Sequence, residues 1–540
     1  MSRDTTLYAC GVTVQSAPPR RVVADGLDSA LIARLAARIA AGDDASRITI
    51  HAPFTGAEIA ALPQSSPDDV AHAVARGRRA QPAWASTAPR ERAAVLWRFH
   101  DQVLEQQARV LDLIQMEAGK ARLHAFEEIA DGAITASWYA RRGPRMLADT
   151  RRPGLMPGLS VATEVRHPWG VVGVIAPWNY PLTLTVAETL PALLAGNAVV
   201  LKPDTQTALT ALWVAQTLEH AGLPPDVLQV VVGDGSVVGP ALVDTVDYVC
   251  FTGSTTIGRT VAQHAAARLV GSSLELGGKN SLYVAADADI ARAAEAAVRD
   301  CFAGAGQVCL TSERLVLHRD VADAFMERFV RRVEGLRLGA GLDYSADVGC
   351  LVSQEQLDRV QSHVDDAVAK GARVVTGGTA RPDIGPTFFA PTVLAGVPLA
   401  ATCYATETFG PVVAVYPVDS DHDAVELIND TPFGLHASVW SRDRNHAFRT
   451  ARRIRSGTVA VNEAYTSAWG AVSSPMGGRG QSGLGRRHGA EGLLRFTEPQ
   501  SVVVERGPGL GPLYAQSGER VSALFSGLLR AARRAHLPWP

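Results

Sequence analysis

Short strand-like runs alternate with helical segments from residue 170 onward, and this alternation constrains the fold more than any other feature of the chain. The runs are mostly apolar and lie at 170–176, 198–201, 228–232, 248–251 and 273–276. The segments between them, such as 205–221 and 255–267, have the apolar spacing of amphipathic helices. Strand and helix in alternation predict a parallel sheet with right-handed crossovers.

Turn-forming and polar residues follow each of these strands. The strings are Pro177-Trp178-Asn179, Lys202-Pro203-Asp204, Gly233-Asp234-Gly235, Thr252-Gly253-Ser254 and Glu275-Leu276-Gly277-Gly278-Lys279. Because ligands bind beyond the carboxyl ends of the strands in an open parallel sheet, we expect this row to form a binding edge. The chain has only four Lys and six Asn, yet Lys202, Lys279 and Asn179 stand in this row. Their scarcity is an independent pointer to local chemistry.

A second α/β stretch begins near residue 280. Its strand-like runs lie at 281–284, 314–318, 373–376, 411–417, 436–441 and 458–461. Helices such as 290–302 and 322–333 separate them. We therefore expect an α/β fold with two doubly wound, Rossmann-like parallel-sheet domains that share one cleft.

The flanking segments differ from these two stretches. Upstream, three segments have helical apolar spacing, at 68–80, 89–119 and 122–140. The passage 141–157, rich in Pro, Gly and Arg, is interpreted as a connector. Near the C-terminus, 506–512 is interpreted as a linker before an amphipathic helix. The apolar face of that helix would carry Val521, Leu524, Phe525, Leu528 and Leu529.

Charge and cysteine content exclude several classes of protein. The chain has 52 Lys and Arg against 54 Asp and Glu, which excludes a nucleic-acid binder that works through a strongly basic field. Its six cysteines are scattered and include no CxxC pair, so we expect neither a disulfide framework nor a metal site. The segment 1–15 has no apolar h-region of the signal-peptide type and no apolar segment has the character of a transmembrane span, so we expect neither a signal peptide nor a membrane span. We expect a cytoplasmic protein.

Cys309 is the cysteine best placed for chemistry. It follows Gly304 and Gly306, whose flexibility would let the backbone approach a substrate and supply an N–H donor beside the sulfur. A thiolate nucleophile needs a lowered pKa or a nearby base, and no His lies close to it in the sequence. Glu275 ends a strand in an apolar, Gly-rich string, where burial would raise its pKa towards neutrality and suit it to proton transfer.

Five strings give the chain a family resemblance. They are Pro177-Trp-Asn-Tyr-Pro181, Phe251-Thr-Gly-Ser254, Leu274-Glu-Leu-Gly-Gly-Lys279, Gly306-Gln-Val-Cys309 and Glu407-Thr-Phe-Gly-Pro411. In this order and spacing they resemble the NAD(P)-dependent, thioester-forming aldehyde dehydrogenases. The resemblance implies that Cys309 attacks the aldehyde carbon and that the Asn179 amide and the Cys309 N–H hold the oxyanion. It also implies that Glu275 activates the water that hydrolyses the thioester.

The same resemblance implies a dinucleotide site. Ser254 heads a predicted helix, whose N-terminal N–H groups favour a phosphate. Relatives that prefer NAD often carry Glu where this chain has the neutral Thr205, so we expect NADP as the preferred cofactor. Asp204, next to it, keeps NAD open as the alternative. The cofactor residues implied are Trp178, Lys202, Asp204, Thr205, Gly233, Thr252, Gly253, Ser254, Glu407 and Phe409.

The resemblance also bears on the substrate. The strings at 202–210 and 475–485 resemble those of bacterial succinate-semialdehyde dehydrogenases, which implies oxidation of succinate semialdehyde to succinate. Other enzymes of that name hold the distal carboxylate with two arginines, whose places are taken here by Ala187 and Ala303. Arg479 is a substitute to consider.

Two alternatives remain open at this point. The expected pocket residues also suit an apolar aliphatic or aromatic aldehyde, and they are Tyr180, Val308, Leu310 and Trp469. A catalytically silent binding or structural member of the same fold is the alternative from another class. Such a member would lack Cys309, Glu275 or Asn179, and all three are present.

The expected domain organisation follows the family. It comprises an NAD(P)-binding domain at 20–145 and 169–277, a catalytic domain at 278–480, a β oligomerisation arm at 146–168 and 494–507, and a tail at 508–540. Because an unpaired arm would expose strand edges, we expect a homodimer or homotetramer.

Overall fold

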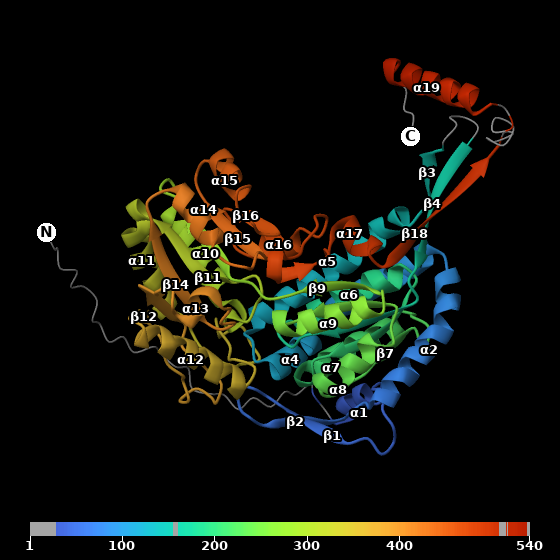
Figure 1. The fold of residues 1–540 in the computed structure, drawn as a ribbon. Helices are drawn as coiled ribbons and strands as arrows, with labels where there is room; N and C mark the ends of the chain where they lie inside the picture. Colours follow the sequence, from blue (N-terminus) through green and yellow to red (C-terminus); the bar gives the residue numbers. More distant parts are fainter. Residues whose placement is uncertain (1–26, 28, 155–159, 507–514, 516, 537–540) are drawn as a thin grey trace.

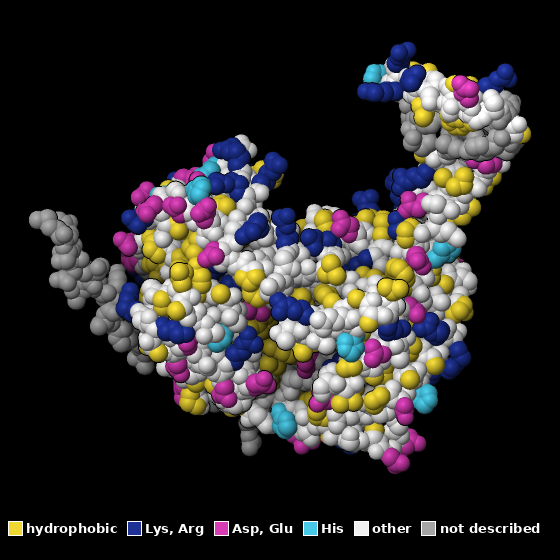
Figure 2. Space-filling view, in the orientation of Figure 1, with side chains coloured by type: hydrophobic (Ala, Val, Ile, Leu, Met, Phe, Trp, Pro, Cys, Tyr) yellow, Lys and Arg dark blue, Asp and Glu magenta, His cyan; other side chains and the backbone are white. Residues whose placement is uncertain are grey.

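Two open sheets make up the body of this computed structural model, which describes residues 27, 29–154, 160–506, 515 and 517–536 (Figure 1). The expectation for 1–15 therefore lies outside the described residues, as do parts of the predicted connector and tail. Acidic and basic side chains are interspersed over the visible face of the body (Figure 2), in keeping with the balanced charge of the sequence. No helix in the described ranges is long and apolar enough to cross a membrane.

The first sheet has six strands in the order β17-β9-β8-β5-β6-β7. The strands are β5 (Val171–Ala176), β6 (Ala198–Pro203), β7 (Leu228–Val230), β8 (Tyr248–Thr252), β9 (Gly271–Glu275) and β17 (Gly483–Leu484). Strands β5 to β9 run parallel, and β17 joins the edge in the antiparallel direction, with Gly483 opposite Glu275. The last third of the chain thus completes a sheet built from the first half.

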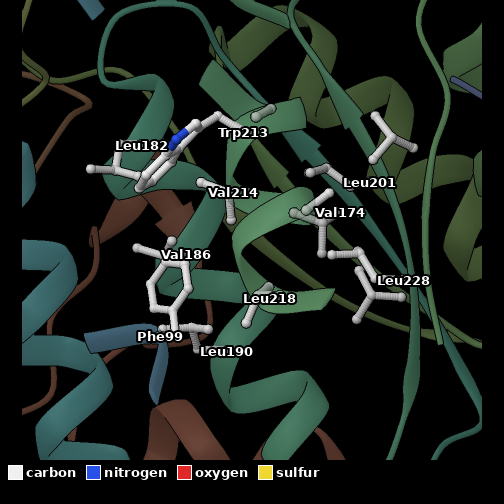
Figure 3. Close-up of a cluster of buried hydrophobic side chains, with 14 of the residues drawn as sticks. Phe99, Val174, Leu182, Val186, Leu190, Leu201, Trp213, Val214, Leu218 and Leu228 are labelled. Atoms are coloured by element: carbon white, nitrogen blue, oxygen red, sulfur yellow. The ribbon is translucent and has the colours of Figure 1, made fainter. Parts of the chain in front are cut away.

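Helices cover both faces of this sheet. They are α1 (Ser29–Ala36), α2 (Pro67–Ser86), α3 (Pro89–Glu105), α4 (Gln107–Ala118), α5 (Arg122–Met146), α6 (Pro181–Leu194), α7 (Ala208–His220), α8 (Gly235–Val243) and α9 (Thr255–Ala267). Alternate residues of a strand point to opposite faces of the sheet. Val174 and Leu201 pack against α3, α6 and α7 (Figure 3), and Val200 packs against α2 and α8 on the other face. Each such buried aliphatic side chain contributes about 1.5–3 kcal/mol to folding.

The second sheet has seven strands in the order β12-β13-β14-β11-β10-β15-β16. They are β10 (Asn280–Val284), β11 (Ser312–His318), β12 (Arg373–Thr376), β13 (Thr392–Ala395), β14 (Val412–Val418), β15 (His436–Trp440) and β16 (Thr458–Val461). All pair in parallel except β12 with β13. The helices around it are α10 (Ile290–Phe302), α11 (Arg319–Glu334), α12 (Gln354–Ala369), α13 (Thr402–Ala405), α14 (Asp421–Asn429), α15 (Arg444–Ala451) and α16 (Thr466–Gly470).

A three-stranded antiparallel sheet projects from the body (Figure 1). It pairs β4 (Ser160–Pro168) with β3 (Thr150–Pro153) on one side and β18 (Thr497–Glu505) on the other. Helix α17 (Gly489–Leu494) leads into β18, and α19 (Gly518–Arg534) lies beyond it at the far end of the projection. On α19 the predicted apolar residues Leu524, Leu528 and Leu529 are exposed.

Local details differ from the sequence expectations. Helix α5 continues to Met146, six residues into the predicted connector, because Gly143 packs closely against Leu194 and extends the buried face. The predicted helix 89–119 is two helices, since Gln106 adopts φ −96° and ψ 15° between α3 and α4. Strand β13 and the hairpin of β1 (Arg47–His51) and β2 (Glu58–Pro63) were not predicted.

Candidate active site

Cys309 lies where two cavities meet. The larger cavity has a volume of about 190 Å³ and runs along the carboxyl ends of the first sheet, between Trp178, Thr252 and Phe409. The smaller cavity, of about 50 Å³, lies on the other side of the sulfur. Both are lined by Asn179, Leu184, Cys309, Met476 and Arg487. A group bound in one cavity can therefore reach a group bound in the other at Cys309.

The loop that carries Cys309 is held by close backbone contact and two amide side chains. Gly306 has φ +71°, and a Cβ there would come within 2.1 Å of the Gly410 carbonyl oxygen. The Gln307 Nε2 donates to the carbonyl oxygens of Gly304 and Cys350 at 3.0 and 3.2 Å. The Asn280 Nδ2 donates to the Cys309 carbonyl at 2.6 Å. The sulfur is thus presented on a fixed backbone.

A buried ion pair positions Asn179, which follows β5. Lys120 Nζ lies 2.6 Å from a Glu128 oxygen and donates to the Asn179 carbonyl at 2.5 Å. The other Glu128 oxygen accepts from the N–H groups of Leu182 and Thr183, at the start of α6. The Asn179 Nδ2 donates to the Gln307 carbonyl at 2.9 Å, which turns its amide towards the Cys309 loop. Sequence reasoning gave Lys120 no such function, although the rarity of Lys pointed to it.

Glu275 ends β9 and lines the larger cavity beside Cys309. Its carboxylate is buried, and Oε1 has no hydrogen-bond partner in the part of the chain that the structure describes. Burial raises the pKa of Glu275 to about 7, against a smaller opposite effect from Arg487. Burial likewise raises the pKa of the Cys309 thiol to about 12, so the resting thiol is protonated and must give up its proton before it can attack.

Six of the ten residues expected at the cofactor line the larger cavity. They are Trp178, Thr252, Gly253, Ser254, Glu407 and Phe409. Trp178 and Phe409 meet edge to face with ring centroids 5.5 Å apart. Ser254 caps α9, its Oγ accepting from the Ile257 N–H at 3.4 Å. The Glu407 Oε1 accepts from the Gly278 N–H at 2.8 Å.

The other four expected cofactor residues lie at or beyond the ends of β6 and β7, outside the lining of that cavity. Thr205 Oγ1 donates to the Gly233 carbonyl at 3.0 Å, which joins the two strand ends. Asp204 Oδ1 accepts from the Gln206 N–H at 3.0 Å. Lys202 is buried, and burial lowers its pKa while Asp204 and Asp234 favour its charged form.

A second buried ion pair, again containing one of the four lysines, supports the far wall of the larger cavity. Lys279 pairs with Glu313, whose carboxylate also accepts from the N–H groups of Thr408 and Phe409. These bonds hold Phe409 at φ +57°, a left-handed conformation that is uncommon for a bulky residue.

The smaller cavity is lined by the four residues expected at the substrate, Tyr180, Val308, Leu310 and Trp469. Ala187 lines it too, and Ala303 packs in the apolar cluster around it. Arg479 is exposed and lines neither cavity.

Sequence reasoning missed Arg487, which lines both cavities. Its Nη2 lies 2.9 Å from a Glu188 oxygen, and Arg495 pairs with the other Glu188 oxygen. Glu188 and Arg487 are 299 residues apart, so no local signal joins them.

Comparison with known proteins agrees with this geometry. The sequence model of the aldehyde dehydrogenase family matches residues 39–502. A Mycobacterium tuberculosis protein, provisionally named succinate-semialdehyde dehydrogenase (NADP+) 2, is 50% identical over 464 residues, 86% of this chain and 90% of its own. The crystal structure of succinate-semialdehyde dehydrogenase from Burkholderia pseudomallei has a TM-score of 0.82 at 33% identity, covering 86% of this chain and 96% of its own.

A second solved structure, an indole-3-acetaldehyde dehydrogenase in complex with NAD+, is equally similar, with a TM-score of 0.82 at 33% identity over 86% of this chain and 94% of its own. The expected α/β architecture with two parallel-sheet domains is confirmed by these neighbours and by the sheets described above. The chain belongs to the aldehyde dehydrogenase family.

Proposed function

We propose that this aldehyde dehydrogenase oxidises succinate semialdehyde to succinate, with NADP+ as the preferred cofactor. The relative at 50% identity carries that activity and cofactor in its name. The observation that carries the proposal within the molecule is the meeting of two cavities at Cys309, with a buried carboxylate, Glu275, beside it.

In the proposed reaction Cys309 Sγ bonds to the aldehyde carbon and the thiol proton leaves. Glu275, with its pKa of about 7, is a base able to accept that proton near neutral pH. The aldehyde oxygen becomes an oxyanion, which the Asn179 amide and the Cys309 N–H stabilise. Because Lys120 and Gln307 already orient Asn179, little reorganisation is needed as charge develops.

The larger cavity fits a nicotinamide dinucleotide. The N-terminus of α9 offers N–H groups to a phosphate, and Gly253 lies at its entrance. Trp178 and Phe409 flank the end nearest Cys309, where Glu407 could bind a ribose hydroxyl. Lys202 and Thr205 would bind the adenosine end, and the neutral Thr205 would admit a 2′-phosphate. Bound NADP+ supplies the acceptor for the hydride that leaves the substrate carbon.

Loss of hydride leaves a thioester on Cys309, and water completes the reaction. Glu275 first releases the thiol proton to solvent, and the restored carboxylate then takes a proton from water as the water oxygen attacks the thioester carbon. The C–S bond then breaks, the carboxylic acid forms and the sulfur departs as thiolate. Glu275 Oε1 has no hydrogen bond to a described residue that would have to break first.

A second substrate class is favoured by a specific observation. The smaller cavity is walled by Tyr180, Val308 and Trp469, and a neighbour at 33% identity is named for an aromatic aldehyde. The deciding measurement is kcat/KM for succinate semialdehyde, hexanal and benzaldehyde with NADP+ and with NAD+. A preference for hexanal or benzaldehyde would overturn the semialdehyde assignment. Absence of any cofactor reduction, unchanged in Cys309→Ala, would support a catalytically silent protein.

We also propose the domain boundaries stated above, a homodimer or homotetramer built through the β3-β4-β18 arm, and a cytoplasmic location. Val502, Val503 and Val504 of β18 are 43–56% exposed, and burying them against a second copy is favourable.

A further inference from the structure

Arg487 is the only Lys or Arg among the described residues that line the smaller cavity. It is 3% exposed, and its backbone pairs with that of Met476 through two hydrogen bonds of 2.7 and 2.8 Å. Met476 lines the same cavity. A cation held this firmly, deep in a pocket that is otherwise apolar or acidic, must be compensated by nearby anions.

Arg487 shares its hydrogen-bonded carboxylate with another arginine. One Glu188 oxygen pairs with Arg487 and the other with Arg495, and all three side chains are largely buried. The charges of Glu275 and Asp131 also act on Arg487, but neither carboxylate hydrogen-bonds to it. Donor capacity on Arg487 is therefore left for a ligand anion.

The hydrogen bonds of Arg487 show where that anion would bind. Its Nε donates to Glu188 Oε1 at 3.1 Å, and its Nη2 lies 2.9 Å from the same oxygen. Nη2 donates to Thr252 Oγ1 at 2.9 Å. Its Nη1 has no hydrogen-bond partner within the described ranges. Glu275, which lines the larger cavity with Arg487, accepts no hydrogen bond from it. One donor nitrogen thus remains for a ligand in the cavity.

His488 supplies a second unpartnered polar group. It is 2% exposed, lines the smaller cavity and has no described partner at Nδ1. Its φ of +62° is unusual for a residue other than Gly and is held by the turn that leads into α17. Burial lowers the pKa of His488 to about 3, so the imidazole is neutral, with one ring nitrogen able to donate a hydrogen bond and the other able to accept one.

Space for a ligand group comes from α6. Residues Thr183, Leu184 and Ala187 of this helix face the cavity, and Glu188 follows on the side of the two arginines. The small Ala187 side chain lines the same cavity as Arg487. We propose that Arg487, assisted by His488, binds the distal carboxylate of succinate semialdehyde and determines selectivity for a carboxylated aldehyde. This inference rests on the proposed function.

Two acidic residues on α5, Glu127 and Asp131, line the same cavity and define the competing possibility. The Tyr465 hydroxyl donates to both Glu127 oxygens at 2.8 and 2.7 Å, so that carboxylate is already engaged. Burial raises the pKa of Asp131 to about 7, which allows a protonated form that donates to a substrate carboxylate. If these acids instead recognise the substrate tail, a cationic aldehyde such as 4-aminobutanal will be preferred.

The test compares kcat/KM for succinate semialdehyde, pentanal and 4-aminobutanal at saturating NADP+. In Arg487→Gln we expect kcat/KM for succinate semialdehyde to fall at least about 30-fold, chiefly through KM, because a charge-assisted bond is lost. The value for pentanal should fall less, because Arg487 also lowers the pKa of Glu275 and of the Cys309 thiol but makes no charge-assisted bond to an apolar tail. Arg487→Lys keeps the charge without the planar fork, so it should recover part of the selectivity.

Arg495→Gln is the matched control, because Arg495 shares Glu188 but lines neither cavity. This variant should change kcat/KM for succinate semialdehyde and for pentanal by the same factor. Competitive inhibition by succinate is measured in wild type and in Arg487→Lys. This comparison tests carboxylate binding even if Arg487→Gln does not fold. Succinate should bind wild type more tightly than this variant.

Two results would overturn the inference: an unchanged ratio of kcat/KM for succinate semialdehyde and pentanal in Arg487→Gln, or a wild-type preference for 4-aminobutanal or pentanal. The first would assign Arg487 to support of Cys309 or Glu275. In each of these cases the protein still oxidises aldehydes. Failure of the activity itself differs, because wild type would then reduce neither cofactor with any aldehyde.

Discussion

The two cavities that meet at Cys309 are built in different ways. The larger is formed mainly by short strings at the ends of consecutive parallel strands, such as the one containing Thr252 and Gly253, where backbone and small residues dominate. The smaller gathers side chains from α5, α6, the Cys309 loop, α16 and the turn before α17. The first construction suits a large cofactor of constant shape. The second allows the substrate to change while the chemistry is retained.

The largest effect is expected at Cys309, where the two cavities meet. Cys309→Ala should lower kcat at least about 10⁴-fold, because the nucleophile is lost and no other described cysteine lines either cavity. NADPH binding, followed by fluorescence, should be retained, since the larger cavity is otherwise intact. Cys403→Ala, which alters a buried cysteine away from both cavities, is the control. Loss of NADPH binding in Cys309→Ala would contradict the separation of the two cavities.

Glu275→Gln tests whether the larger cavity also contains the base for hydrolysis. We expect kcat to fall about 10²- to 10³-fold. A rapid first turnover that releases one NADPH per site would show that the thioester still forms, and its absence would show that Glu275 is already required before hydride transfer. Glu327→Gln, on the exposed face of α11, is the control.

The pH profile follows from the same carboxylate. Glu275 must be deprotonated to accept a proton, and its pKa is raised to about 7. The kcat of wild type should therefore decline as pH falls below about 7, roughly tenfold per pH unit at the acid end. In Glu275→Gln this acid limb should disappear. A limb of unchanged midpoint in the variant would assign it to another group.

Lys202→Arg tests the cofactor site alone, because it should change the affinity for the cofactor and leave the affinity for the aldehyde unchanged. A broad guanidinium cannot replace a compact buried ammonium, so we expect KM for NADP+ to rise about tenfold, while KM for the aldehyde stays constant. Lys370→Arg makes the same replacement at an exposed lysine paired with Asp366, and it should have no effect. An unchanged cofactor KM in Lys202→Arg would remove Lys202 from the site.

The smallest expected effect is a change of preference. Thr205→Glu places a carboxylate near the expected 2′-phosphate and should lower kcat/KM for NADP+ about fivefold relative to NAD+. Thr205→Val removes the hydrogen bond to Gly233 without adding charge, so it isolates the electrostatic part. If both variants shift the ratio equally, the geometry of the strand ends sets the preference, and charge does not.

The contrast between the cavities also explains what could be predicted from the sequence. The parallel strands and the strings that end them are local features, so the edge with Asn179, Ser254 and Glu275 was visible in the sequence. Arg487 was not, because its partner Glu188 lies far away along the chain and only folding joins them. The short strand β13 and the break at Gln106 were not predicted for a different reason, because the backbone geometry there depends on tertiary packing.

The rarity of lysine in the sequence pointed to residues of the site. Three of the four lysines lie at the site or beneath it: Lys120 beside Asn179, Lys279 with Glu313, and Lys202 at the end of β6. The fourth, Lys370, makes an exposed ion pair with Asp366. Scarcity therefore located buried ammonium groups with specific partners, but it could not detect an arginine in a chain rich in Arg.

The antiparallel pairing of β17 with β9 has a consequence for how the protein is made. During synthesis β9 leaves the ribosome more than 200 residues before Gly483 and Leu484, which complete its edge. Until then the strand that ends in Glu275 has one unpaired side, and an unpaired edge invites association with other chains. A nascent chain that stalls before residue 483 should therefore be aggregation-prone as well as inactive. The pairing of β17 with β9 therefore completes the strand that ends in Glu275 and covers the edge of the sheet in one late folding step.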